Sequence, residues 1–194
     1  MKNKNKHINK ISASTIAKTA VMAAIIAALS QIAIPLPSGV PVTMQVFAIA
    51  FVGYLFGWLG VVSVAVYLSV GAIGAPVFAN FKGGFAVFAG PTGGFLWGFL
   101  LMAFFCALGK NRKIWLNILF GLMGFACCHL LGIVQFAAFT DSTLKSAFVL
   151  VSLPYIIKDI LSVVAAYFLA VACSKGLTKA GIKNDYALFK RKLN

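Results

Sequence analysis

Residues 74–95 read GAPVFANFKGGFAVFAGPTGGF, a stretch that cannot form a helix along its length. Its two prolines lack a backbone N–H donor, and its repeated glycines permit tight turns and close approach of the backbone. Phe78 and four further phenylalanines supply aromatic walls, whereas Asn80, Lys82 and Thr92 supply the few polar side chains. Small-molecule pockets have this kind of lining, so the stretch is interpreted either as a ligand-binding segment or as a plain surface loop.

The sequence around this stretch has the composition of an integral membrane protein. Of its 194 residues, 61% are hydrophobic and 10% are charged, whereas soluble domains carry about 25% charged residues. The net charge of +14 lies mostly at the ends of apolar runs, where it contacts anionic lipid rather than nucleic acid. The four cysteines lie in apolar runs without CxxC spacing, which predicts neither a disulfide nor a metal site.

Apolar runs in the sequence predict transmembrane helices. These runs are 19–34, 46–73, 93–109 and 114–136, followed by a last one. The last run begins near Val149, or slightly later if Ser152 and Pro154 mark its start. The first helix begins near Ser12 and ends before the prolines of 35–41. The run 46–73 is longer than the about 20 residues that one span needs, so it forms either one long helix or two short ones divided at 57–60.

The distribution of lysine and arginine decides between five helices and six. With the division at 57–60, both basic tails and the basic loop 110–113 share one face, and only Lys82 and Lys145 lie opposite. The positive-inside rule then predicts an all-α integral membrane protein with six transmembrane helices and both termini cytoplasmic. We expect a single six-helix membrane domain over 1–194, with basic cytoplasmic tails at 1–12 and 178–194, located in the plasma membrane.

The pair Lys158–Asp159 is the sharpest polar signal inside an apolar run. An ionisable residue in a membrane helix is costly and usually faces the bundle interior. A start near residue 149 places Asp159 about ten residues into the last helix, and a start at 152–154 places it in the second turn. Adjacent residues on a helix do not face each other, so no simple ion pair is expected. Either Asp159 points into a pocket with Lys158 at its side, or Lys158 extends outward while Asp159 bonds a neighbouring helix.

Other polar side chains allow two interpretations each. Thr43 and Gln45 precede the second helix on the outer face, where they either cap the helix or contact a ligand. His129 is interpreted as a satisfied interior histidine rather than a proton relay, and Gln135 as a pocket or interface residue. The chain contains no P-loop motif and no catalytic or metal-ligating cluster with workable spacing, so we expect neither an enzyme nor a cofactor.

Four motifs together resemble the BioY family, the biotin-binding S components of energy-coupling-factor (ECF) transporters. They are PLPSGVPVTMQ at 35–45, GAIGAPVFA at 71–79, GPTGGF at 90–95 and a proline five residues before Asp159. The resemblance extends from the first helix to the last, and the first three motifs are specific only in combination. It implies a six-helix fold, biotin capture outside the cell, and docking on a transmembrane coupling (T) subunit with two ATPase subunits.

The resemblance also implies that Asn80 and Asp159 bond the ureido ring of biotin, with Lys158 beside them. A urea group needs a carboxylate acceptor and an amide donor, which these residues supply. Phe78 and other apolar side chains suit the rings, and the candidate donors to the ligand carboxylate are Thr43, Gln45, Thr92 and Lys82. Two alternatives remain: an S component for another vitamin, such as thiamin or riboflavin, and a stand-alone secondary transporter.

Small residues follow one face of the first predicted helix. Ala20, Ala24 and Ala28 are spaced four residues apart and form a ridge that permits close approach of a second helix. The ridge packs either against this chain's own helices or against a partner. The resemblance favours a partner, because an Ala-xxx-Ala pattern on this helix is how such S components meet their coupling subunit.

Overall fold

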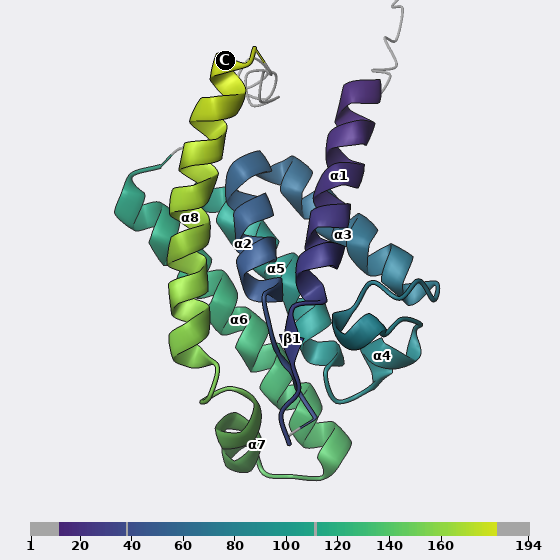
Figure 1. The fold of residues 1–194 in the computed structure, drawn as a ribbon. Coiled ribbons are helices and arrows are strands. Elements are labelled where there is room, and N and C mark those ends of the chain that lie inside the picture. The colour runs from purple at the N-terminus through teal and green to yellow at the C-terminus, as the bar shows by residue number, and fades with distance from the viewer. Residues whose placement is uncertain (1–11, 38, 111, 182–194) are drawn as a thin grey trace, which may run out of the picture.

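The computed structural model describes residues 12–37, 39–110 and 112–181, which form a bundle of long helices with small elements at one end (Figure 1). The long helices are α1 (Ala13–Ser30), α2 (Gln45–Phe56), α3 (Trp58–Ala72), α5 (Gly93–Gly109), α6 (Ile114–Thr140) and α8 (Ile156–Lys179). The small elements are β1 (Ala33–Ile34), β2 (Val42–Thr43), the 3₁₀ turn η1 (Ala79–Phe81), α4 (Ala86–Ala89) and α7 (Leu144–Val151).

The run 46–73 is divided into two helices, as the charge distribution predicts. Gly57 ends α2 with φ 59° and ψ −123°, a conformation that favours glycine, and α3 begins at the next residue. Of the described helices, α1, α6 and α8 are long and apolar enough to cross a membrane, whereas α2, α3 and α5 are apolar but shorter.

Three helix boundaries differ from the sequence prediction. The first helix ends at Ser30 and does not continue to Ile34, the residue directly before the prolines. Ala33 and Ile34 instead pair with Thr43 and Val42 in an antiparallel hairpin. The fifth long helix, α6, continues to Thr140, and the last one, α8, begins only at Ile156. Residue 149 belongs instead to α7, whose N-cap Thr143 accepts a hydrogen bond from the Ser146 N–H.

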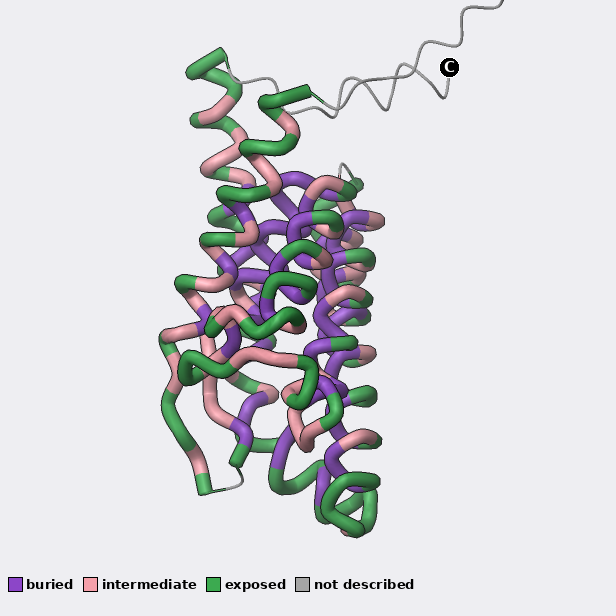
Figure 2. The backbone as a smooth tube through the Cα atoms, turned by 90° about the vertical axis from the view of Figure 1, so that its right-hand side faces the viewer, coloured by how far each residue is buried: buried purple, intermediate pink, exposed green. Residues whose placement is uncertain are grey.

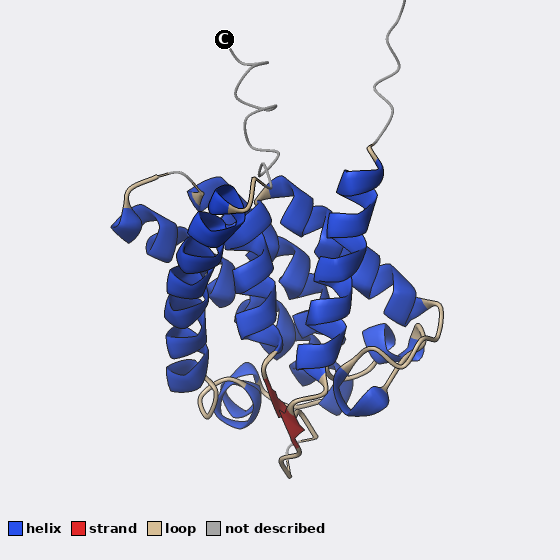
Figure 3. Cartoon of the chain, turned by 45° about the horizontal axis from the view of Figure 1, so that its top comes forward, coloured by secondary structure: helices blue, strands red, loops and turns tan. Residues whose placement is uncertain are grey.

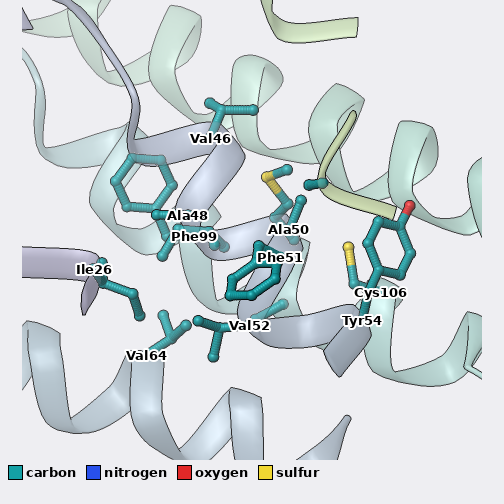
Figure 4. Close-up of a cluster of buried hydrophobic side chains, with 14 of the residues drawn as sticks. Ile26, Val46, Ala48, Ala50, Phe51, Val52, Tyr54, Val64, Phe99 and Cys106 are labelled. Atoms are coloured by element: carbon teal, nitrogen blue, oxygen red, sulfur yellow. The ribbon is translucent and has the colours of Figure 1, made fainter. Parts of the chain in front are cut away.

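Helix α2 lies at the centre of the bundle, between α1, α5 and α8 (Figure 1). All of its residues except Phe47 are buried, as expected for a helix that is apolar on every side. Figure 4 shows its side chains packed among residues of the neighbouring helices, for example Val52 near Val64 and Tyr54 near Cys106. The large exposed hydrophobic side chains lie instead on the surrounding helices and the loops, consistent with a lipid-facing surface. Figure 2 shows buried positions inside the bundle and exposed positions along its outside.

Glycines let α5 and α6 approach closely. A Cβ atom on Gly94 would lie 2.2 Å from the Leu131 carbonyl oxygen, and one on Gly98 would lie 2.6 Å from Cys128 Cα. Both distances are impossible contacts, so the small-xxx-small pair at 94 and 98 is a helix-packing feature, as its spacing suggests.

The two ends of the bundle differ in structure. The first residues of α1 and the last residues of α8 lie at one end (Figure 1). The hairpin, the segment 73–92 and α7 lie at the other, where loops and the small sheet replace the helices (Figure 3).

Candidate ligand-binding pocket at the loop end

Asp159 lies in the first turn of α8, at the loop end of the bundle. It is only 2% exposed, and its backbone N–H donates to the Tyr155 carbonyl over 2.8 Å. Of the two expected positions, the one about ten residues into the helix is wrong, because α7 takes up residue 149. The start at 152–154 is closer, since α8 begins at Ile156 and Asp159 lies in its first turn. The N-terminal position stabilises the carboxylate, since a helix N-terminus carries a partial positive charge.

Lys158 turns inward and reaches around the helix to Asp159. Its Nζ forms an ion pair with Asp159 Oδ1 and donates a hydrogen bond of 2.7 Å to the Thr43 carbonyl. The expectation that these neighbours form no simple pair is therefore wrong, because the long lysine side chain bridges the angle between adjacent positions. Its outward extension is also excluded, and Lys158 connects α8 to the β2 strand.

His129 completes this buried polar cluster from α6. Its Nε2 lies 3.4 Å from Asp159 Oδ2, and its Nδ1 shares a hydrogen bond of 2.8 Å with the Ser152 hydroxyl. The rings of Phe95 and Phe125 pack against the imidazole. His129 is thus the satisfied interior histidine that was expected, although it also lines the pocket.

One oxygen of Asp159 keeps an unused hydrogen-bonding capacity. Within the described part of the chain, buried Oδ1 has no hydrogen-bond partner, and the contact with Lys158 Nζ lacks hydrogen-bond geometry. A buried acceptor in this state is costly unless a further donor reaches it. A ligand N–H in the pocket would supply that donor.

Gln45 and Thr43 line the pocket where α2 begins, and the Thr43 carbonyl is the one that Lys158 contacts. The Gln45 amide donates to the Tyr67 hydroxyl over 2.8 Å, and the Thr43 hydroxyl donates to Gln45 Oε1 over 3.2 Å. The Gln45 N–H in turn donates to Thr43 Oγ1 over 3.3 Å, so Thr43 also binds the start of α2. Phe78, 2% exposed, packs edge-on against the Tyr67 ring and forms an aromatic wall beside them.

The segment 74–92 covers the pocket and is held by two glutamines. Gln31, just after α1, donates to the Val77 and Phe78 carbonyls, each over 3.2 Å, and accepts from the Phe81 N–H over 3.0 Å. Gln135 of α6 donates to the Phe88 and Gly90 carbonyls over 2.6 and 2.8 Å. The interpretation of Gln135 as an interface residue is therefore the better one.

Asn80 adopts a left-handed conformation, with φ 58°, at the tip of this segment. Phe81 follows with φ 55°, which is unusual for a bulky residue and is maintained by the Gln31 bond to its N–H. The side chains of Asn80, Lys82 and Thr92 have no hydrogen bond to other described residues. Their donors are thus available to a ligand.

One cavity brings together all eight residues that the sequence nominated for ligand binding. They are Thr43, Gln45, Phe78, Asn80, Lys82, Thr92, Lys158 and Asp159. Sequence reasoning missed other lining residues, among them Phe95, Phe99 and Tyr155, whose hydroxyl donates to the Val40 carbonyl over 2.5 Å. The one sequence signal for the position of Tyr155 at the pocket would have been a break in the last helix just before this residue.

Ala20, Ala24 and Ala28 are exposed on the outer face of α1, away from this pocket. The ridge therefore does not pack against the chain's own described helices, which removes one of its two interpretations.

Known proteins resemble this chain in sequence and in fold. The family model described as "BioY family" matches residues 1–179. The chain belongs to the BioY family. It is 38% identical over 132 residues to the "Probable biotin transporter BioY" of Pyrococcus horikoshii, covering 68% of this chain and 78% of that protein. It is 35% identical over 162 residues to the "Biotin transporter BioY" of Thermotoga maritima, covering 81% of this chain and 94% of that one.

The fold resembles a BioY-type solved structure as well. The crystal structure of the S-component for biotin from an ECF-type ABC transporter matches with a TM-score of 0.75 and 25% identity, over 90% of this chain and 95% of that one. The resemblance that the motifs indicated is thereby confirmed. The BioY family groups this multi-pass membrane chain with transporters rather than with enzymes.

Proposed function

We propose that this BioY-family chain captures biotin at the outer face of the plasma membrane and acts as the S component of an ATP-driven ECF transporter. The observation that carries the proposal is the buried Asp159 Oδ1, which lacks a hydrogen-bond partner among the described residues and lies in an aromatic-lined cavity. A urea N–H of biotin is a donor of the kind this oxygen requires. The printed names of the relatives agree with this substrate.

The polar groups of the pocket suit the two ends of biotin. Asp159, with Lys158 and His129 beside it, would accept from the urea, and Asn80 would donate to the urea carbonyl. Lys82, Thr92, Thr43 and Gln45 are the proposed donors to the ligand carboxylate, and Lys82 and Thr92 have no bond to other described side chains. Phe78 would pack against the ligand's apolar part.

We also propose six membrane spans with both termini cytoplasmic. The division at Gly57 and the common end of the first residues of α1 and the last residues of α8 support this topology. Residues 1–194 would form one membrane domain, with basic tails at 1–12 and 178–194; α8 continues as helix to Lys179, and the remaining tail residues lie almost entirely outside the described residues. The coupling subunit and two ATPase subunits are the proposed partners, and Ala20, Ala24 and Ala28 the proposed contact.

The ligand is identified by mass spectrometry of molecules released from the purified chain. We expect biotin, and calorimetry with biotin, thiamin and riboflavin should show that only biotin binds tightly. Release of another vitamin would contradict the substrate assignment. Uptake in cells that lack the coupling module separates the alternatives further, because a stand-alone secondary transporter needs neither ATP nor partner subunits.

A further inference from the structure

A second cavity lies at the opposite end of the molecule from the Asp159 pocket. It is bounded by the end of α2, the loop 110–113, the first turn of α6 and the second half of α8, and its volume is about 230 Å³. A single water needs roughly 10–15 Å³ of such space, so this cavity can admit a larger group. None of the residues nominated for biotin binding lines it.

Among the described residues, three cations and no carboxylate line this cavity, namely Lys110, Arg112 and Lys175. The two described carboxylates are remote from this cavity, because Asp141 follows α6 at the loop end and Asp159 lies in the first pocket. Asp185 lies outside the described residues. Like charges that converge on one cavity repel each other, and an anion placed between them offsets that repulsion.

The cationic loop is held in place by buried hydrogen bonds. Asn117, 4% exposed, donates through Nδ2 to the carbonyls of Arg112 and Lys113, over 2.8 and 3.2 Å. The Tyr54 hydroxyl donates to the Asn117 carbonyl over 3.1 Å. The backbone that carries Arg112 is therefore anchored to the first turn of α6.

Arg112 retains donors for an anion, and Lys110 adds positive charge to the cavity. Arg112 donates through Nε to the Leu108 carbonyl over 3.1 Å and stacks on Phe120, and the rest of its planar guanidinium suits the oxygens of a phosphate. Lys110 Nζ donates to the Leu55 carbonyl, and burial lowers the pKa of Lys110 to about 8. An anion nearby would favour the charged form of this lysine.

Two tryptophans indicate the depth of the cavity in the membrane. Trp58 begins α3 directly after the α2 turn, and Trp115 lies in the first turn of α6, 40% and 61% exposed. Tryptophan is enriched at the level of the lipid headgroups. Both residues lie next to the elements that bound the cavity, so the cavity opens near the depth of the lipid phosphates.

We propose that this cavity binds a phosphate-bearing anion between Arg112 and Lys175. The shared chemistry is a phosphate group, and its two possible sources are the headgroup of an anionic lipid and free phosphate. Basic pockets between membrane helices bind anionic headgroups in this way. The site is separate from biotin capture and would hold the ends of α2, α6 and α8 together.

The test compares two charge-matched double variants of the full chain. Arg112→Gln with Lys175→Gln removes two lining cations, and Lys113→Gln with Lys179→Gln removes two exposed cations outside the cavity. Native mass spectrometry and thermal unfolding are measured with phosphatidylglycerol, with phosphatidylcholine, and with inorganic phosphate. Biotin binding reports whether each variant is folded.

We expect phosphatidylglycerol, and not phosphatidylcholine, to remain bound and to raise Tm in the wild type and the control variant. In the cavity variant its retention should fall about tenfold or more. If inorganic phosphate alone reproduces the shift, the site stands and free phosphate is its ligand. Equal losses in both double variants, or no effect of any of these anions on the wild type, would overturn the proposal.

Discussion

At the scale of single residues, Asp159 concentrates the chemistry of the pocket. Its Oδ2 lies near His129, and its Oδ1 contacts Lys158 but has no hydrogen bond within the described residues. The N-terminus of α8 and the Lys158 ammonium place positive charge beside the carboxylate, and Oδ1 still lacks a hydrogen bond within the described residues. A ligand with N–H donors therefore gains more from this site than one without them.

Asp159→Asn and Asn80→Ala should each weaken biotin binding strongly while the chain stays folded. Removing one partner of a buried hydrogen bond costs about 1–3 kcal/mol, and more when a charge is involved. Calorimetry measures the loss. Desthiobiotin, which keeps the urea, should bind far better than an analogue that lacks it.

Asp141→Asn is the matched control for the aspartate, because it removes the same charge from an exposed position after α6. Its biotin affinity should equal that of the wild type. Affinities of Asp159→Asn and Asn80→Ala within twofold of the wild type would refute the proposed role of both residues.

The sequence could predict the residues of the pocket whose type is unusual for its surroundings. An aspartate in an apolar helix and polar residues within an aromatic, glycine-rich segment are such cases, and they do line one cavity. Phe95, Phe99 and Tyr155 could not be separated from ordinary core aromatics, because their pocket position depends on tertiary packing. The inward course of Lys158 was mispredicted because helix spacing ignores the reach of a long side chain.

At the scale of elements, the two glutamines that hold segment 74–92 can be tested separately. Gln31→Ala should increase hydrogen exchange around 77–82, and Gln135→Ala should do so around 88–90, because each removes side-chain bonds to that part only. Both should weaken biotin binding by exposing the pocket. Unchanged exchange in both regions would show that other contacts hold the segment.

The alanine ridge of α1 makes a second prediction at this scale. Ala24→Trp should leave biotin affinity of the purified chain intact and abolish ATP-dependent uptake with the coupling module, because it blocks close helix approach. Ala126→Trp, at an exposed position of α6, is the control and should retain uptake. Loss of biotin binding in Ala24→Trp would place the docking surface elsewhere.

The long helices could be predicted from apolar runs, glycines and charge, and the charge distribution also predicted the division that Gly57 makes in the run 46–73. The small elements could not. Residues 33–34 and 42–43 form strands only because they meet each other, and α7 occupies residues near 149, which was one of the expected starts of the last helix. Tertiary pairing and a change of helix direction decided these boundaries.

At the scale of the whole molecule, the proposed six-span topology assigns each charged loop to one side of the membrane. We expect Lys4, Arg112 and Lys192 to be cytoplasmic, and Lys82 and Lys145 to face outside; Lys4 and Lys192 lie outside the described residues. Single cysteines at these positions, in a chain without its native cysteines, are labelled with an impermeant reagent. Labelling of position 112 from outside would contradict the six-span topology.

The end of α1 contacts the segment 74–92 that lines the pocket, although the alanine ridge of this helix is exposed. Ser30 donates to the Val77 carbonyl over 2.5 Å, and Gln31 binds the adjoining backbone that carries Phe78. If a docked partner shifts this helix, the shift changes the free energy with which the pocket binds the vitamin. By thermodynamic reciprocity, the vitamin then changes the affinity for the partner by the same factor. S components with and without bound vitamin would thus compete with different affinities for one coupling module.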